Sequence, residues 1–494
     1  MKQFLKKYHY QFNYMLLALF LTCFHPLYIF SSDSYFMIAQ GKDILNGGLF
    51  RTSDIFSIHD GFAFLHQKWL MCIETYFVYS LFGNMGLVAM SFILFFLGIC
   101  MMIYILEFFM PRHFAVNIPV LVMATYVLAM FSAYRPQMVA FLLLGLLLLG
   151  LEKYVNDVIH TKSYYVLFFF ISLLMMWYHS TLWIFTVVFW LPYFCDFSGE
   201  YKHNKPELLK VLIAILIASI CQPNGIKQYS YMWNCMRATS PVYLRLVGEL
   251  KSNPTSIENI LIYVLSLLCL ILWIWHKKFN LRATYMLIGA VGLSIISYRF
   301  NIYAVLLSVF AIAISNKGIY PAANKWQKII ISLSMMFTVF FSAHMAMSTY
   351  NETYYKGMLD YGLGQKAVNT LTANVDSPSD VILCCIPADV GSFAISQGYR
   401  VYFDCRAEIY DIAINKYKDV LSEYLGIIGG KYNGNNTDTF MIDFDEDYSF
   451  DYYVVSNRSD FVIDSLSQYA FCNYSDECYS IYSFTDERIF KEAP

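Results

Sequence analysis

The first 346 residues alternate between long apolar runs and short polar intervals. About 20 apolar residues span the hydrocarbon core of a bilayer, so each long run predicts a membrane-crossing helix. The eleven runs lie near residues 12–30, 85–109, 114–132, 137–152, 164–179, 181–195, 207–221, 258–275, 282–298, 300–315 and 326–346. A further run, 69–82, is short and bounded by Lys68 and Gly83-Asn84. It is either an embedded or interfacial helix or a twelfth span, so we expect about 11 (11–13) transmembrane helices.

From about residue 350 the sequence becomes mixed and polar, over the length of one small domain. Short runs rich in β-branched and aromatic residues predict strands at 381–385, 399–403, 452–455 and 478–482. A helix is expected near 411–425 and a loop at 431–437. The predicted architecture is a polytopic α-helical membrane domain, 1–346, followed by a small C-terminal α/β domain, 347–494.

The composition supports a membrane protein. Hydrophobic residues make up 58% of the chain and charged residues 14%, whereas soluble domains carry about 25% charged residues. No basic run suggests a nucleic-acid partner. Most of the 12 cysteines stand alone in apolar runs, and whether Cys472 and Cys478 form a disulfide depends on the compartment that the tail faces.

The lysines and arginines indicate the orientation of the chain. If 69–82 does not cross, most of them fall in intervals on one side, which the positive-inside rule identifies as the cytoplasm. The N-terminus is then cytoplasmic in a multi-pass protein of the plasma membrane. The first external loop, 31–69, and the tail lie outside the cytoplasm.

The first external loop places Asp33 directly after the first apolar run. A carboxylate beside lipid is costly unless it is solvated or has a function. Asp33 is therefore a candidate catalytic base, and the alternative is a helix-end carboxylate solvated by headgroup water. Asp54 is a second candidate catalytic carboxylate in the same loop.

Arg135 and Arg299 each stand at a span end on the predicted outer face. A guanidinium group binds phosphate with two parallel hydrogen bonds, so the pair is suited to a phosphate or pyrophosphate group. The alternative for each arginine is ordinary snorkelling of its head group to the membrane interface.

His66 and His179 are candidates for acid–base chemistry or for binding a metal with Asp33 or Asp54. The alternative is a structural role near the membrane interface for each histidine.

Three further positions are candidates for binding substrate. Glu249 either binds substrate hydroxyls or caps a helix, and Asn224 lies in a Gln-Pro-Asn-Gly turn that ends a span. Asp404 and Arg406 follow a predicted strand, where they form either a ligand site or an internal ion pair of the fold.

The order of these motifs resembles bacterial integral-membrane glycosyltransferases of the GT-C fold. In the first loop the resemblance rests on Asp33, Gly41, Asn46-Gly47, Asp54-Ile-Phe-Ser57, Gly61, Trp69-Leu70 and Gly86-Leu87. It continues in Arg135-Pro-Gln137, Trp177-Tyr-His179, Pro223-Asn-Gly225, Glu249, Arg299, Asp389-Val-Gly391 and the stretch 401–410. The similarity is colinear over nearly the whole chain, although each motif alone is short.

The resemblance implies a polyprenyl-phosphate-sugar donor, an external active site and Asp33 as the catalytic carboxylate of the first loop. Many members, though not all, use a divalent cation. The resemblance therefore leaves open whether Mg²⁺ or Mn²⁺ is a cofactor of this chain. The family commonly has a histidine where this chain has Met37, and His-Glu where it has Gln67-Lys68. These departures bear on metal dependence.

We therefore predict a membrane glycosyltransferase that moves a sugar from a polyprenyl-phosphate donor to an extracytoplasmic glycan, lipid or protein acceptor. Asp33 would be the base, and Asp54, with His66 or His179, would orient the acceptor or a metal. Arg135 and Arg299 would hold the phosphate of the donor. Membrane lipids are expected as further partners. The alternatives are a surface-polysaccharide polymerase and a lipid-linked sugar transporter or flippase. A transporter is expected to place ionisable residues in mid-span, whereas here they gather at span ends.

Overall fold

The computed structural model describes residues 14–23, 25, 32–111, 113–156, 162–198, 205–237, 250–277, 279–317 and 355–492. The chain forms two compact units. The first comprises Met1–Ile29, Asn84–Gly225 and Glu249–Thr349, and the second Phe30–Gly83, Ile226–Gly248 and Tyr350–Pro494. The first external loop thus groups with the tail, whereas the sequence division assigned it to 1–346. The predicted span 326–346 lies outside the described residues.

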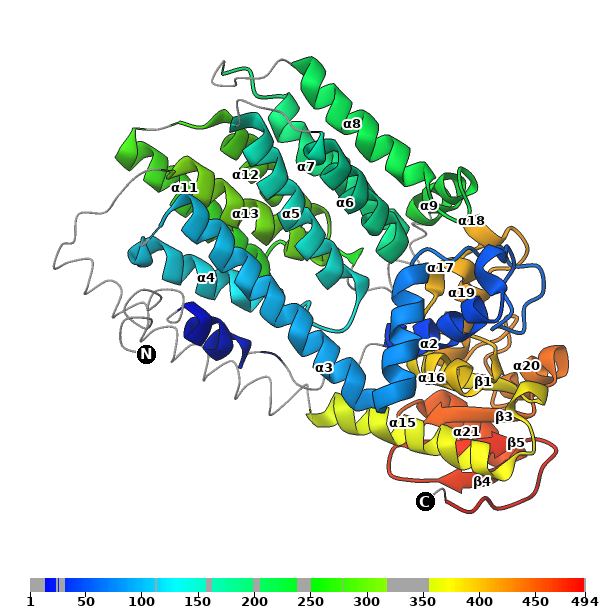
Figure 1. Cartoon of the computed structure of the whole chain (residues 1–494). Coiled ribbons are helices and arrows are strands. Elements are labelled where there is room, and N and C mark those ends of the chain that lie inside the picture. The colour runs from blue at the N-terminus through cyan, green and yellow to red at the C-terminus, as the bar shows by residue number, and fades with distance from the viewer. Residues whose placement is uncertain are drawn as a thin grey trace. The chain divides into compact units, whose positions relative to one another are not determined.

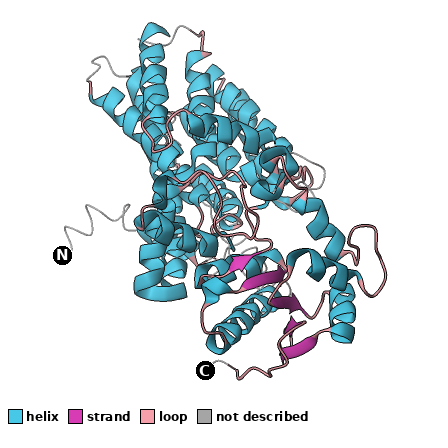
Figure 2. Cartoon of the chain, turned by 90° about the vertical axis from the view of Figure 1, so that its right-hand side faces the viewer, coloured by secondary structure: helices cyan, strands magenta, loops and turns pink. Residues whose placement is uncertain are grey.

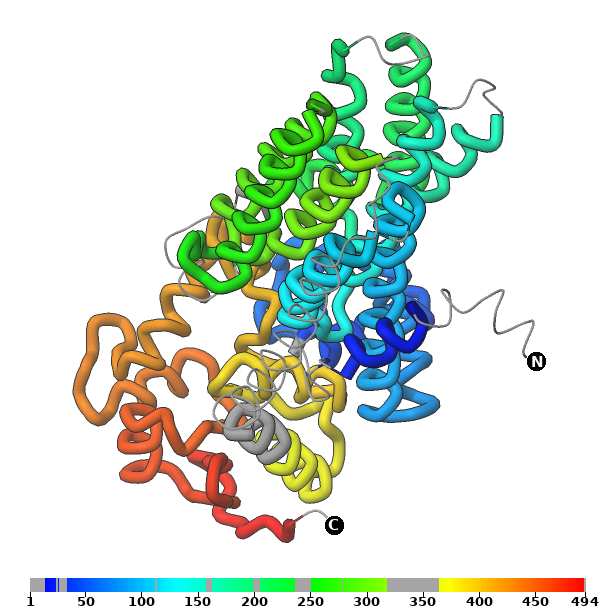
Figure 3. Tube along the Cα trace, turned by 90° about the vertical axis from the view of Figure 1, so that its left-hand side faces the viewer, coloured from blue at the N-terminus to red at the C-terminus, as the bar shows by residue number. Residues whose placement is uncertain are grey.

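The first unit is helical, and its described helices follow the predicted apolar runs. They are residues 14–22, the second part of α3 (Trp69–Phe109), α4 (Phe114–Ala129), α5 (Pro136–Asn156), α6 (Ser163–His179), α7 (Ile184–Phe194), α8 (Lys205–Ile220), α11 (Ile257–His276), α12 (Leu281–Ile296) and α13 (Asn301–Ser315), with the 3-10 turns η2 (Ser180–Trp183) and η4 (Tyr298–Phe300). Helices α11 and α12 both pack against α13, among the green tubes of Figure 3. The side chains of α13 are buried throughout.

Five helical stretches among the described residues are long and apolar enough to cross a membrane. They are Trp69–Phe109, Pro136–Asn156, Ser163–Phe194, Ile257–His276 and Tyr298–Ser315. Two shorter apolar helices, Phe114–Ala129 and Leu281–Ile296, accompany them. The multi-span helical architecture is therefore present, and the predicted count of about 11 is not confirmed.

The stretch Ser163–Phe194 is two antiparallel helices, α6 and α7, as the sequence predicts. The indole N–H of Trp183 donates to the hydroxyl of Ser172 over 2.7 Å. Eleven residues rise about 16 Å in a continuous helix, so this bond requires the chain to reverse. The reversal occurs where His179 adopts extended backbone, with φ −166° and ψ 99°.

Gly83 divides α3 into the helices 69–82 and 84–109. Its φ of 59° and ψ of −150° lie in a region that essentially only glycine adopts. The helix 69–82 belongs to the second unit and packs on α2 (Ser32–Leu45), where a Cβ on Gly41 would meet the carbonyl oxygen of Cys72 at 2.2 Å. The short apolar run is therefore a separate helix beside the first external loop.

The second unit is built on a five-stranded sheet in the order β2-β1-β3-β5-β4 (Figures 1 and 2). Its strands are β1 (Ile382–Ile386), β2 (Arg400–Val401), β3 (Tyr452–Ser456), β4 (Phe471–Ser475) and β5 (Tyr479–Ser483). Strand β1 is parallel to β2 and β3, whereas β5 is antiparallel to β3 and β4. The four predicted strands are present. The prediction missed β4.

Helices cover both faces of this sheet. Helices α15 (Tyr355–Asn374) and α16 (Ala388–Gln397) pack on one face, and α19 (Val420–Ile428), α20 (Phe440–Tyr448) and α21 (Asp460–Tyr469) on the other. The helix predicted near 411–425 is instead two helices, α18 (Ile412–Asn415) and α19. They are separate because Lys416 adopts a left-handed conformation, with φ 62°.

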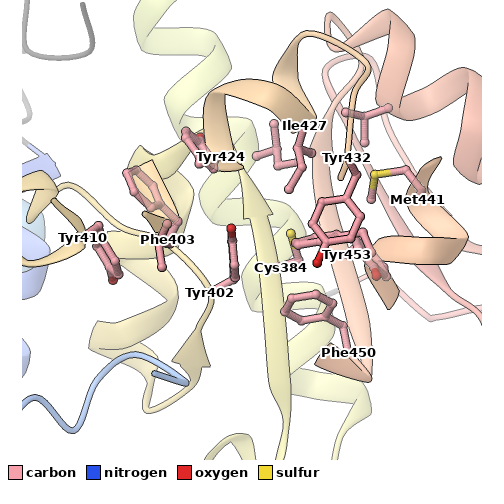
Figure 4. Close-up of a cluster of buried hydrophobic side chains, with 14 of the residues drawn as sticks. Cys384, Tyr402, Phe403, Tyr410, Tyr424, Ile427, Tyr432, Met441, Phe450 and Tyr453 are labelled. Carbon is pink, nitrogen blue, oxygen red and sulfur yellow. The ribbon is translucent and has the colours of Figure 1, made fainter. Parts of the chain in front are cut away.

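The core between the sheet and the second group of helices is aromatic. Cys384, Tyr453 and Tyr402 extend from the strands and the segment after β2 toward Tyr424 and Met441 on the helices (Figure 4). The first external loop adds Phe62 and Phe64 to the same core. Burying a phenylalanine contributes about 1.5–3 kcal/mol, so these two rings anchor the loop to the tail.

Candidate active site

The first external loop extends the sheet at β2, its edge strand. The amide of Ile58 donates to the carbonyl of Val401 over 3.0 Å, and the amide of Val401 donates to the carbonyl of Phe56 over 3.1 Å. Ser57 and Val401 thus form a parallel bridge. An edge strand presents unpaired amide and carbonyl groups, and this bridge pairs those of Val401.

A buried ion cluster fastens the loop beside this bridge. The guanidinium Nη1 of Arg406 donates to Asp54 Oδ1 over 2.5 Å, and its Nε and Nη2 donate to Asp404 over 2.9 and 2.7 Å. Tyr410 donates its hydroxyl to Asp404 over 2.6 Å, and the amide of Ser57 donates to Asp54 over 2.9 Å. Asp404 is 0% exposed, Arg406 1% and Asp54 7%.

Within this cluster, Arg406 is the shared partner of Asp54 and Asp404. Burial alone would raise the pKa of Asp54, but the charge and hydrogen bonds of Arg406 hold that pKa below its usual value. Asp54 therefore stays ionised inside the unit. Of the two alternatives for Asp404 and Arg406, the geometry matches the internal ion pair.

His66 lies in a second polar cluster inside the loop. Arg51 donates to both carboxylate oxygens of Asp43 over 3.0 and 2.8 Å, and His66 Nε2 lies 3.7 Å from the same carboxylate. Burial would raise the pKa of Asp43, but the contacts with His66 and Arg51 lower it below its usual value. His66 is buried against Phe64 and Asp43, a position that suits folding of the loop.

Asp33 lies in the first turn of α2, where the helix dipole favours a negative charge, and it is half-buried. It lies in electrostatic range of Glu408, which follows the ion cluster on α17 (Ala407–Tyr410). Burial raises the pKa of Glu408, and the charge of Asp33 raises it further, whereas Lys68 and Arg406 lower it. Asp33 and Lys68 thus act on Glu408 with opposite effects on its pKa.

Glu408 was not among the predicted site residues. In the stretch Asp404-Cys-Arg-Ala-Glu408, the sequence predicts only Asp404 and Arg406 as candidates, because an Asp–Arg pair is a recognisable motif. The signal in the sequence that could have identified Glu408 is its acidic side chain, two positions after Arg406. Nothing in the local pattern linked it to Asp33, which is distant in sequence.

In the first unit, Arg299 is joined to the segment that carries Arg135. With its amide oxygen turned toward Arg299, Gln137 accepts from Nε over 3.1 Å and from Nη2 over 2.6 Å. Gln137 is in the first turn of α5, two residues after Arg135. The two predicted phosphate ligands therefore belong to one polar region of the first unit.

His179 and Asn224 occupy another part of the first unit. The ring Nδ1 of His179 is 2.8 Å from the hydroxyl of Thr181, at the reversal between α6 and α7. Trp177 donates its indole N–H to the carbonyl of Cys221 over 3.1 Å, which places the end of α6 beside the turn that holds Asn224. Glu249 lies outside the described residues.

A metal ion bound by the protein alone would need several ligand side chains close together. Within the described ranges, no group of three or more His, Cys, Asp or Glu side chains is placed to hold one. Asp54 uses both carboxylate oxygens in the ion cluster, and Met37 is buried in α2. No disulfide joins Cys472 and Cys478.

No family model and no curated protein sequence matches this chain. Solved structures do. ArnT from Cupriavidus metallidurans, bound to undecaprenyl phosphate, superposes with a TM-score of 0.55 at 10% identity, covering 97% of this chain and 98% of ArnT. The oligosaccharyltransferase of Archaeoglobus fulgidus, tethered to an acceptor peptide, gives 0.54 at 11%, covering 98% and 75%. The mycobacterial arabinofuranosyltransferase AftD gives 0.54 at 11%, covering 97% and 40%.

These likenesses, at low sequence identity, establish the fold. The chain has the GT-C fold of integral-membrane glycosyltransferases, as the resemblance of its motifs predicted. With its apolar helices, it is a multi-pass membrane protein.

Proposed function

We propose that this protein transfers a sugar from a polyprenyl-phosphate-linked donor to an acceptor outside the cytoplasm. The observation that carries the proposal is the position of Asp33, a carboxylate in the first turn of α2 with Glu408 in electrostatic range. The GT-C fold supports it, since ArnT binds undecaprenyl phosphate and the archaeal oligosaccharyltransferase forms complexes with dolichol-phosphate and with peptides.

In the proposed reaction, Asp33 removes the proton from an acceptor hydroxyl as its oxygen attacks the anomeric carbon. The bond between that carbon and the phosphate oxygen breaks, and polyprenyl phosphate leaves with the electron pair. The new glycosidic bond forms with inversion, and the proton remains on Asp33 until the product leaves. A positioned general base contributes about 10²- to 10⁴-fold in rate.

Arg135 and Arg299 would stabilise the departing phosphate. Two guanidinium groups can neutralise the charge that develops on the leaving oxygen. The link between Gln137 and Arg299 supports this role because it fixes the guanidinium plane at the start of α5. His179, Asn224 and Glu249 stay predictions as substrate ligands.

Asp54, Asp404, Arg406 and His66 would act by holding the first loop. Their hydrogen bonds and ion pairs are made with one another, with Asp43 and with the loop backbone.

The test compares glycans and lipid intermediates from cells that carry the wild type, a deletion, Asp33→Asn or Asp60→Asn at equal protein level. Asp60 is the control, since its carboxylate is 99% exposed on the same loop. We expect the deletion and Asp33→Asn to lose the same sugar and to accumulate the same unmodified acceptor, with a fall of at least about 10²-fold. Asp60→Asn should match the wild type.

If Asp33→Asn behaves as the wild type while the deletion has a phenotype, Asp33 is not the base. A transport or flippase role would then be favoured. Loss of chain length, without loss of a single sugar addition, would instead favour a polysaccharide polymerase.

A further inference from the structure

The helix 69–82 packs on α2 with one of its faces. The Cys72 thiol donates to the side-chain oxygen of Gln40 over 3.2 Å, and the ring centroids of Tyr79 and Tyr35 lie 6.3 Å apart. Residue numbers thus rise along one helix as they fall along the other, which means that the two helices are antiparallel. The end of helix 69–82 therefore lies beside the start of α2.

The opposite side of helix 69–82 is apolar and exposed. Successive residues of a helix turn by about 100°, so positions i, i+3, i+7 and i+11 fall on one stripe. This stripe is the apolar face of the helix and consists of Leu70, Ile73, Phe77 and Leu81. Phe77 is 50% exposed and Leu81 70%, whereas Cys72 and Thr75 on the inner side are 0% exposed. A threonine thus faces the protein while leucine and phenylalanine face away from it, the reverse of a surface helix in water.

The chain joins this helix directly to a helix that is apolar enough to cross a membrane. The second part of α3, 84–109, matches a long apolar run, and α3 is long and apolar enough to span a bilayer. Ile93 and Leu97 of this part are 47% and 43% exposed, as the lipid-facing residues of a span are expected to be. Because only Gly83 separates the two helices, the end of helix 69–82 lies at the membrane surface.

The length of the apolar face indicates how the helix lies against the membrane. Its 14 residues rise about 21 Å, so a helix that projected from the surface would keep Leu81 near lipid and leave Leu70 in water. The apolar face continues to Leu70 without a charged residue inside it, which fits a helix that lies flat. Glu74 and Ser80 border the face on its two sides, where a flat helix places polar groups at the level of the head groups.

We propose that helix 69–82 lies flat in the interface of the lipid bilayer, with its apolar face among the acyl chains. The partner is the leaflet on the side of the first external loop. Asp33, in the first turn of α2, lies two residues before Tyr35 and so beside the end of this helix. Docking therefore holds α2 against the membrane and keeps Asp33 near the head groups, where a lipid-linked phosphate would lie. The docking itself is independent of the proposed function, and only this consequence for Asp33 rests on it.

The experiment uses the wild-type full chain, reconstituted in vesicles of phosphatidylcholine and phosphatidylglycerol that contain a phospholipid with a diazirine on its acyl chain. Light converts the diazirine to a carbene, which inserts into side chains that contact the acyl chains, and tandem mass spectrometry locates the insertions. Leu97 is the reference for lipid contact, and Phe461, 62% exposed on the tail, is the matched reference for water contact. We expect insertion at every residue of the apolar face, at least about tenfold more often than at Phe461.

A second measurement oxidises the same vesicles with hydroxyl radicals generated in the water. We expect Phe77 to be oxidised at least about tenfold more slowly than Phe461, because the acyl chains exclude water from it. Oxidation of Phe77 at the rate of Phe461 would show a face in water and would overturn the docking. Insertion at Leu81 without Leu70 and Ile73 would show a projecting helix, and protection of the face without insertion would show a protein cover. Either of these results also overturns the docking.

Glycan profiling of Asp33→Asn separates the docking from the proposed function. If the apolar face takes up the lipid label while Asp33→Asn transfers normally, the docking stands and the proposed function fails. If Asp33→Asn abolishes transfer while the apolar face is oxidised from the water, the docking is wrong and the proposed function stands.

Discussion

Replacing Arg406 with methionine should release the first external loop from the tail. Methionine replaces the aliphatic part of the side chain and removes the guanidinium group that contacts Asp54 and Asp404. Both carboxylates would then be buried without their cation. The rings of Phe56 and Phe64, whose centroids lie 5.1 and 5.4 Å from the guanidinium carbon, would lose a cation–π partner as well.

The expected loss follows from the burial of the cluster. Removing one partner of a buried ion pair costs about 3–5 kcal/mol, because the other charge stays buried. Here two charges are left, so the upper part of this range applies. Every 1.4 kcal/mol is a factor of ten in an equilibrium, so the open state of the loop should gain about 10³-fold or slightly more in population.

Hydrogen–deuterium exchange of the full chain measures this opening at the bridge itself. The amides of Ile58 and Val401 form the two hydrogen bonds of the bridge, and their exchange should accelerate by the same factor. Arg488→Met is the control, because Arg488 forms an exposed ion pair elsewhere on the tail. Unchanged exchange at Ile58 and Val401 would refute the reasoning. Equal acceleration in the ladder between β3 and β5 would show that the cluster supports the whole tail.

Three further predictions follow from other contacts. Burial opposes ionisation of Asp54 but Arg406 lowers its pKa, so the stabilisation by this pair is complete above pH ~4 and is lost as the pH falls further. Exchange of the loop, corrected for intrinsic rate, should be flat from pH 7 to about 5 and rise below about 4; a rise already near pH 6 would contradict this assignment. Gly41→Ala would place a Cβ 2.2 Å from the oxygen of Cys72 and should lower stability by about 1–3 kcal/mol in thermal unfolding, whereas Gly292→Ala, with no atom within 4 Å, should not. Arg299→Lys loses the planar fork and should reduce the transferred sugar about tenfold in glycan profiling; full transfer would remove Arg299 from the phosphate site.

The elements of this protein followed from local patterns where the buried side chains form a continuous apolar run. Strands β1 and β3 are buried at nearly every position, and their apolar runs marked them in the sequence. Strand β4 is different, because Phe471, Cys472 and Ser475 are exposed and its register with β5 shifts between Cys472 and Tyr474. No apolar pattern remains to identify such a strand, which is why the prediction missed it.

The candidate site depended on contacts that no local pattern contains. Asp33 was found because a carboxylate at a membrane edge is unusual by itself. The partner of Arg406 is Asp54, 352 residues earlier, and only folding of the loop onto β2 places the two together. The sequence therefore left two interpretations of Asp404 and Arg406, and the geometry of the ion cluster matches the internal pair.

The same bridge explains where further functional residues should be sought. Because the loop pairs with β2 through Val401, the residues that follow β2 are carried to the loop that begins with Asp33. Arg406 pairs with Asp54 and so fastens the segment that carries Glu408 to the loop, and the charges of Asp33 and Lys68 act on Glu408. A substitution in the ion cluster should thus reduce transfer only as far as it frees the loop, whereas Asp33→Asn should reduce transfer with the loop still docked. Exchange at Ile58, measured in both variants, separates these two effects.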